Sequence, residues 1–146
     1  MSLPPLPPAE KSSLTPFSVL QPPGWAKPRG YANGVAATGR LVFVAGQIGW
    51  NAAAEFESDD LVAQTAQALR NVVAVLHEAG ALPAHIVRMT WYVTDRAEYL
   101  GRAAEIGGVY REVIGRHYPA MSAVEVSALM EDRARVEIEV TAVIPQ

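Results

Sequence analysis

Cysteine is absent from the 146 residues of this chain. Disulfides, thiol catalysis and cysteine-ligated zinc are therefore excluded. Histidine is scarce as well, and His77, His85 and His117 lack the spacing of a metal-binding motif such as HExxH. No uninterrupted apolar run reaches the roughly 20 residues that span a bilayer. The sequence therefore predicts a protein with no metal, no cofactor and no membrane partner.

A basic surface is also missing. The formal net charge is −3 and the isoelectric point is about 5.6, whereas nucleic-acid binding needs clustered Lys and Arg. We therefore expect no nucleic-acid partner. The N-terminus lacks the basic-then-apolar order of a signal peptide, so a cytoplasmic location is expected.

Proline is unevenly distributed, because residues 1–28 hold eight of the eleven prolines. Repeated proline blocks both helices and sheet ladders. We therefore predict a proline-rich mobile tail over residues 1–16 and a single domain over residues 17–146, with a first strand over residues 17–21. Half of the residues are hydrophobic, which is enough for a sizeable core in a chain of this length.

Two helices are predicted. The first begins after Ser58, a favourable N-cap residue, and ends at Gly80, where a left-handed residue is expected. Its apolar side chains recur on one face at helical spacing. These are Leu61, Thr65, Ala68, Leu69, Val72, Leu76 and Ala79. The second helix begins after Asp95, with Glu98 at the capping-box position, and runs to about Arg116.

The remaining apolar segments predict strands. Residues 35–38 and 40–48 are joined across Thr38-Gly39, which is typical of a hairpin. Residues 86–94 alternate between apolar and polar side chains, as a half-buried strand does. Further strands are expected over residues 123–129 and 134–143.

This order of elements predicts an α+β, two-layer sandwich in which two helices lie on one face of a mixed β-sheet. Leu41 to Ala45 is apolar without alternation and offers apolar side chains to both faces of that sheet. The face without helices therefore needs another cover, and we expect an oligomer.

Six segments, taken in order, resemble those of the RidA/YjgF family, whose members are often labelled endoribonuclease L-PSP. The resemblance covers about residues 30–143, and no single segment decides it. Tyr118 to Val126 is similar to the Pro-Ala-Arg-Ser signature of that family. The other segments are Gly30–Gly34, Ala45–Ile48, Gln64–Val72, Ile86–Asp95 and Val136–Val140.

The resemblance implies a chorismate-mutase-like fold (β-α-β-β-α-β) and a homotrimer with ligand clefts between subunits. It implies hydrolysis of a reactive enamine, imine or related small nitrogen compound. Tyr31 would line the cleft, Glu137 would orient or activate a water molecule, and Ala120 and Met121 would frame the ligand. From the residues alone, Glu137 could equally be a solvated carboxylate on a polar strand face.

Two further residues are candidates for substrate binding because of their places at a strand end. The side-chain amide of Gln47 could reach a cleft, although strand-end capping is an equal alternative. Trp50 lies just past the strand, where loops commonly build sites.

The sequence departs from the family at Met121, which stands where active members carry an arginine. Arginine grips a carboxylate with two charge-assisted hydrogen bonds, and methionine offers no donor. Arg29, next to the Gly30-Tyr31 segment, could supply a replacement cation. Two functions therefore remain open: a Rid-like hydrolase of the deaminase type, or an inactive homotrimer that binds or senses a metabolite.

Overall fold

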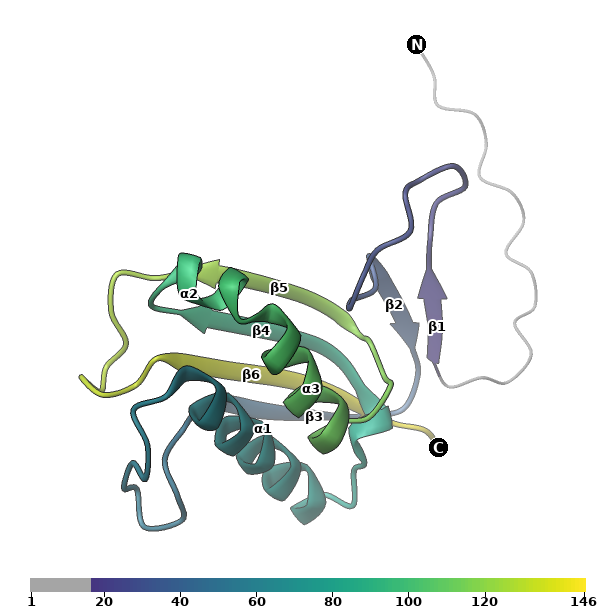
Figure 1. The fold of residues 1–146 in the computed structure, drawn as a ribbon. Coiled ribbons are helices and arrows are strands. Elements are labelled where there is room, and N and C mark those ends of the chain that lie inside the picture. Colours follow the sequence, from purple (N-terminus) through teal and green to yellow (C-terminus); the bar gives the residue numbers. More distant parts are fainter. Residues whose placement is uncertain (1–16) are drawn as a thin grey trace.

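The computed structural model describes residues 17–146. Figure 1 shows a four-stranded sheet with helices on one face and a separate pair of short strands. The elements are β1 (Phe17–Leu20), β2 (Gly34–Ala37), β3 (Arg40–Ile48), α1 (Leu61–Glu78), the 3-10 turn η1 (Pro83–His85), β4 (Ile86–Val93), α2 (Arg96–Gly101), α3 (Ala103–Val113), β5 (Ala120–Glu125) and β6 (Val136–Ile144). The predicted tail over residues 1–16 lies outside the described residues, and the single domain over residues 17–146 stays a prediction.

The main sheet has the strand order β3-β6-β4-β5. β4 and β5 run parallel, whereas β6 is antiparallel to both β3 and β4. The helices α1 and α3 lie on the same face of this sheet (Figure 1). The predicted α+β sandwich, with a mixed sheet and helices on one face, is therefore confirmed.

The core lies between this sheet and the helices. The predicted apolar face of α1 is confirmed, since all of its members are buried except Ala79, which is partly buried. Across from it, residues 89–93 of β4 and 136–142 of β6 alternate as half-buried strands do, with every second side chain in the core. The alternation of β4 is offset at Ile86, where the pairing with β6 shifts register. The principal buried side chains are Val44, Leu61, Leu69, Val72, Leu76, Ile86, Met89, Trp91, Val136, Ile138 and Val140.

The start of α1 differs from the prediction by two residues. Asp60, rather than Ser58, is the N-cap, and its carboxylate accepts a hydrogen bond from the Ala63 N–H. Ser58 instead accepts a hydrogen bond from the Asp60 N–H with its hydroxyl. Both residues are good caps, and the carboxylate gains more because it faces the positive end of the helix dipole.

The predicted second helix is two helices. Asp95 caps α2 as expected, but the chain leaves helical geometry at Arg102, where φ is −111° and ψ is 20°. The Arg102 guanidinium binds Asp60 on one side and Glu105, at 2.7 Å, on the other. These ion pairs tie the break to the start of α1. Gly107 and Gly108 lie inside α3 and do not interrupt it.

Strand pairing also corrects the sequence reading. β2 pairs with β1 and not with β3, which pairs with β6 instead, so the expected hairpin across Thr38-Gly39 is wrong. The turn signal shows where the chain bends but carries no information about pairing partners. β5 begins at Ala120, three residues before the predicted strand, because it pairs in parallel with β4 from Arg88 onward.

Gln64 is the largest buried polar side chain of α1, with 1% of its surface exposed. Its Nε2 donates to the carbonyl oxygens of Ser58 (3.0 Å) and Arg133 (2.9 Å). Its Oε1 accepts a hydrogen bond from the Arg135 N–H at 2.8 Å. One side chain therefore joins the helix layer to the segment that enters β6.

We predict that Gln64→Leu lowers the free energy of unfolding by about 1–3 kcal/mol, because three part-buried backbone groups lose their hydrogen-bond partner. Urea denaturation at fixed protein concentration measures this change. Gln67→Leu is the matched control on the same helix, since Gln67 is half-buried and donates only to the Asn71 side chain. Equal losses of stability in the two variants would contradict the assigned role of Gln64.

Candidate functional site

A cavity of about 610 Å³ lies between α3, the strands β4 and β5, and the loop at residues 29–31. Its lining includes five aromatic side chains, two arginines and one methionine. Its lining is Arg29, Gly30, Tyr31, Trp91, Tyr99, Ala103, Ile106, Gly107, Tyr110, Arg111, Tyr118, Met121 and Ala123.

The parallel pairing of β4 and β5 determines what the sheet contributes to this cavity. Met89 pairs with Met121 and Trp91 pairs with Ala123, so these four residues share one face. Met89 and Trp91 are buried in the core beneath the helices. Met121 therefore points toward α3, and the register of β5 places it in the cavity.

Helix α3 forms the opposite wall through residues at helical spacing. Ile106 and Tyr110 are four residues apart and both are buried, so they belong to the face that packs on the sheet. Gly107 and Arg111, again four residues apart, lie along the next row and reach the cavity rim.

The aromatic rings form a continuous wall. Tyr110 is stacked on Tyr118 with 5.7 Å between ring centroids and an interplanar angle of 13°. Trp91 lies 6.3 Å from Tyr110 and 6.4 Å from Tyr99. The hydroxyl of Tyr110 donates to the backbone carbonyl of His117, which fixes the orientation of the ring.

The phenols of this wall are held in their neutral form. Burial raises the pKa of Tyr99, and burial together with the neighbouring Tyr118 raises the pKa of Tyr110. Both groups remain protonated at neutral pH. The wall therefore carries no negative charge there.

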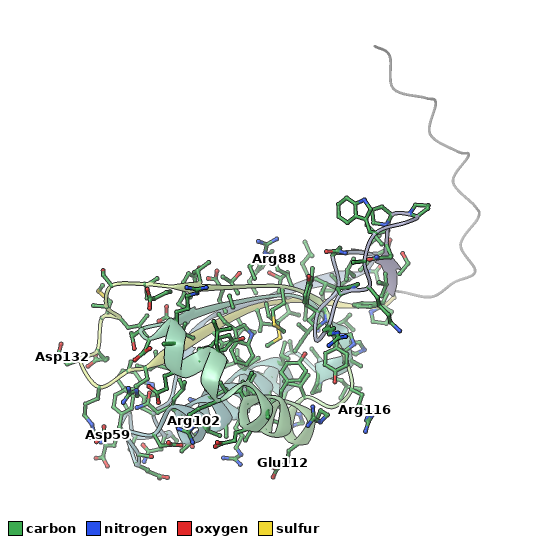
Figure 2. All side chains as sticks on the ribbon, turned by 45° about the horizontal axis from the view of Figure 1, so that its top comes forward. Asp59, Arg88, Arg102, Glu112, Arg116 and Asp132 are labelled. Atoms are coloured by element: carbon green, nitrogen blue, oxygen red, sulfur yellow. The ribbon has the colours of Figure 1, made fainter. Side chains whose placement is uncertain are left out.

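The other face of the sheet carries the carboxylates. Tyr92 pairs with Glu137, and its hydroxyl donates to Glu139 at 2.7 Å. Tyr92 shares its face with Arg88, four residues earlier in the strand. In Figure 2, Arg88 projects from the side of the sheet opposite Arg102 and Glu112, which lie on the helix side.

Glu137 therefore lies on the helix-free face. Its carboxyl group crosses the backbone of β3 at Gly46, where a Cβ atom would be 2.7 Å from Glu137 Cδ. Only glycine leaves this space free.

The predicted site residues lie on both sides of the main sheet. Tyr31 and Met121 line the cavity together with Arg29, whereas Ala120, which forms a bridge with Ala32, is not among the lining residues. Glu137 is on the opposite face of the same sheet. Within the described chain, these two halves do not meet.

Gln47 and Trp50 lie away from the cavity. The Gln47 Nε2 donates to the carbonyl of Ala45, which is the strand-end interaction named as its alternative. Trp50 packs on Phe56 with 5.9 Å between ring centroids, beside a smaller hollow near Arg133. Their assignment to substrate binding stays a prediction without geometric support in one protomer.

The sequence reading missed most of the cavity wall. Trp91 is both a core residue and part of the wall. Tyr110 and Arg111 were read only as parts of a helix. Their spacing from Ile106 and Gly107 could have placed them on one side of that helix, but not over β5.

Neither a metal cluster nor a membrane helix is found in the part of the chain that is described. Over residues 17–146, no three His, Asp or Glu side chains gather as metal ligands would. Over the same range, no helix has the length and apolar character needed to cross a bilayer. The cytoplasmic location stays a prediction.

Comparison with known proteins gives consistent matches. The sequence model of the family described as Endoribonuclease L-PSP matches residues 26–144. A RutC family protein of Haemophilus influenzae is 39% identical over 105 residues, which are 72% of this chain and 80% of that protein. The 2-iminobutanoate/2-iminopropanoate deaminase of Escherichia coli K12 is 34% identical over 116 residues, covering 77% and 86% of the two chains.

Solved structures agree with the sequence matches. A protein of unknown function of the conserved Rid family, YyfB from Yersinia pestis, superimposes with a TM-score of 0.80 at 34% identity, over 89% of this chain and 100% of that one. The Escherichia coli protein TdcF, solved with bound serine, gives a TM-score of 0.62 at 32% identity, over 87% and 98%.

The tight contact beneath Glu137 generates a test of its position. Gly46→Ala should cost up to about 1 kcal/mol of unfolding free energy, because the new methyl group makes the end of the flexible Glu137 side chain move aside. Adding Glu137→Ala should recover most of this loss, since the colliding atoms are gone. A double-mutant cycle by urea denaturation measures the coupling.

Gly108→Ala is the control for this cycle, because no atom lies within 4 Å of the position that its Cβ would take. This change inside α3 should raise stability slightly, as alanine for glycine does in a helix. Purely additive effects of Gly46→Ala and Glu137→Ala would place the carboxylate elsewhere.

Proposed function

The chain belongs to the endoribonuclease L-PSP family, which contains the RidA/YjgF proteins, and we propose that it hydrolyses an enamine, imine or related nitrogen metabolite in a cleft between two protomers. Its fold is the chorismate-mutase-like α+β fold of that family. One observation carries the proposal. The same family-matched domain has a cavity lined by Tyr31 and Met121 on one face of its sheet and the Glu137 carboxylate on the other.

The two faces of the sheet support a cleft between protomers. Glu137 and Met121 lie on opposite faces of one sheet, so a complete site needs Glu137 from a neighbouring copy. The helix-free face also exposes 59% of Leu41 and 72% of Phe43 in the single chain. Apolar side chains of this size are typical of an interface. We propose a homotrimer, as the family resemblance implies.

The chemistry follows from the groups available. Water adds to the carbon of the C=N bond, with Glu137 of the neighbouring protomer accepting a proton from that water. The nitrogen takes up a proton, the carbinolamine collapses, and ammonia leaves a carbonyl product. No metal or redox partner enters this balance. The 2-imino acid deaminases among the relatives are named for this type of reaction.

One observation favours a second function, the binding or sensing of a metabolite without turnover. Met121 cannot hold a carboxylate in the place of the family arginine, so the ligand would lose an orienting contact there. TdcF, a structural relative, was solved with bound serine, which is consistent with a cleft for amino-acid-like ligands. Turnover measurements distinguish the two functions.

For the hydrolase, we predict that Glu137→Gln lowers the rate of imine hydrolysis by about 100-fold or more, because the amide cannot accept the proton of the attacking water. Imines generated in situ from amino acids by an amino-acid oxidase serve as substrates, and formation of the carbonyl product is followed against buffer. Glu139→Gln, which removes a carboxylate from the same face, should leave the rate close to wild type.

If no imine in such a panel is hydrolysed faster than in buffer, the chain is a binding protein. Equal losses in Glu137→Gln and Glu139→Gln would instead show a general effect of charge on that face.

A site shared between protomers also predicts complementation. Glu137→Gln and Ala123→Trp, which fills the cavity mouth, should each abolish hydrolysis as pure proteins. When the two are unfolded together at equal amounts and refolded, about one quarter of the clefts should combine an intact cavity with an intact Glu137 in a closed ring. Recovery of activity in the mixture, measured with the same imine, supports the shared site. A mixture as inactive as its parts would place the site within one protomer.

A further inference from the structure

On the basis of the proposed function, we propose that the cavity beneath α3 selects 2-imino acids with an aromatic side chain. In this assignment, Arg111 and Arg29 hold the substrate carboxylate in place of the missing family arginine. The aromatic wall and Met121 hold the ring. The proposal therefore names the class of substrate for the same site.

The first step of the argument is the charge of the cavity. Arg29 and Arg111 both line it, and no Asp or Glu does so among the described residues. Over residues 17–146, neither guanidinium lies within salt-bridge distance of a carboxylate, whereas Arg102, Arg133 and Arg135 all do. Two uncompensated guanidinium groups at the rim of an apolar cavity favour an anionic ligand.

The second step is the position of Arg111. One of its terminal nitrogens lies 3.3 Å from the point that a Cβ of residue 107 would occupy. The guanidinium of this exposed residue therefore folds back along α3, over the glycine. Because Gly107 has no side chain, the space above it is left to the Arg111 guanidinium.

The third step is the shape of the remaining space. Aromatic rings bound the cavity of about 610 Å³ on several sides. The rings of Tyr110 and Tyr118 are stacked and nearly parallel, and the ring of Trp91 is tilted against that of Tyr110. A small aliphatic imine would contact little of this wall and would leave the rest to water. An aromatic side chain can stack on it, and the Met121 thioether adds a favourable contact with a ring.

Aromatic walls also bind organic cations, so the charge must decide between the two kinds of ligand. A cation over these rings would lie near Arg29 and Arg111 without any carboxylate to offset the repulsion. An anion with an aromatic ring satisfies both features at once.

Trp91 offers a further contact. Its Nε1–H is buried and has no acceptor among the described residues. An unpaired buried donor is unfavourable, and a ligand acceptor that reached it from the cavity would remove that cost.

The reaction balances without an added reactant. The 2-imino acid takes up one water at its C=N carbon, loses ammonia, and leaves a 2-oxo acid with the same aromatic side chain. The carboxylate remains unchanged throughout and serves only to orient the substrate on the two arginines.

Binding of the unreactive 2-oxo acid tests the inference separately from turnover. The reporter is Trp91 fluorescence in the full chain with Trp25→Phe and Trp50→Phe, titrated with phenylpyruvate, pyruvate and phenethylamine. We expect phenylpyruvate to bind at least about 10-fold more tightly than pyruvate, because only it can stack on the wall. Phenethylamine, which has the ring but carries a positive charge, should bind more weakly than either.

Arg111→Gln should weaken phenylpyruvate binding by about 10- to 100-fold, as expected for the loss of a charged hydrogen-bond pair. Arg29→Gln should weaken it in the same direction. Arg116→Gln is the matched control, because Arg116 is an exposed arginine just beyond α3 that does not line this cavity (Figure 2). Circular dichroism of each variant confirms folding.

The inference is overturned if pyruvate binds as tightly as phenylpyruvate, or if Arg111→Gln and Arg29→Gln bind phenylpyruvate as wild type does. Glu137-dependent hydrolysis of aliphatic imines with no binding of phenylpyruvate would retain the hydrolase and reject the aromatic substrate class. Arginine-dependent binding without hydrolysis of any imine would retain the recognition of aromatic carboxylates by the cavity and reject the hydrolase.

Discussion

The alternation of side chains along β4, β5 and β6 is the constraint on which the rest of this molecule depends. It sends Trp91 and Met121 toward the helices and Glu137 toward the open side. The sheet itself separates the apolar cavity from the Glu137 carboxylate of the same chain, and no side-chain rotation can bring the two together. In the proposed function, assembly is part of the chemistry, because Glu137 of a second copy would supply the carboxylate that the cavity of one chain lacks.

The helix layer is held in position by polar contacts of a different kind. Gln64 bonds to backbone groups before α1 and before β6, and Arg102 links α1 to the break between α2 and α3. These contacts set where α3 lies over β5. Residues outside the cavity therefore help to determine its width. They also help to position the aromatic side chains that α3 contributes to its wall.

Much of the fold could be predicted because it depends on local periodicity. The apolar face of α1 and the alternation of β4 each follow from one segment of sequence, and both are confirmed. The pairing of β2 with β1 is not local, and the break at Arg102 depends on Asp60, 42 residues earlier in the chain. For the site, the resemblance placed Tyr31 and Met121 in one cavity. It did not reveal Arg111 or Tyr110, because their role requires α3 to lie over β5.

The strand β5 lies at one end of the main sheet order and is short, with Val124 46% exposed. Its outer edge receives only a single bridge, from Ala32, over the described residues. A newly synthesised chain therefore presents an incompletely paired strand together with the open apolar face around Phe43. Such surfaces template non-specific pairing with other chains until native partners cover them. For the proposed oligomer, the interval between release from the ribosome and assembly is therefore when these surfaces are most open to aggregation.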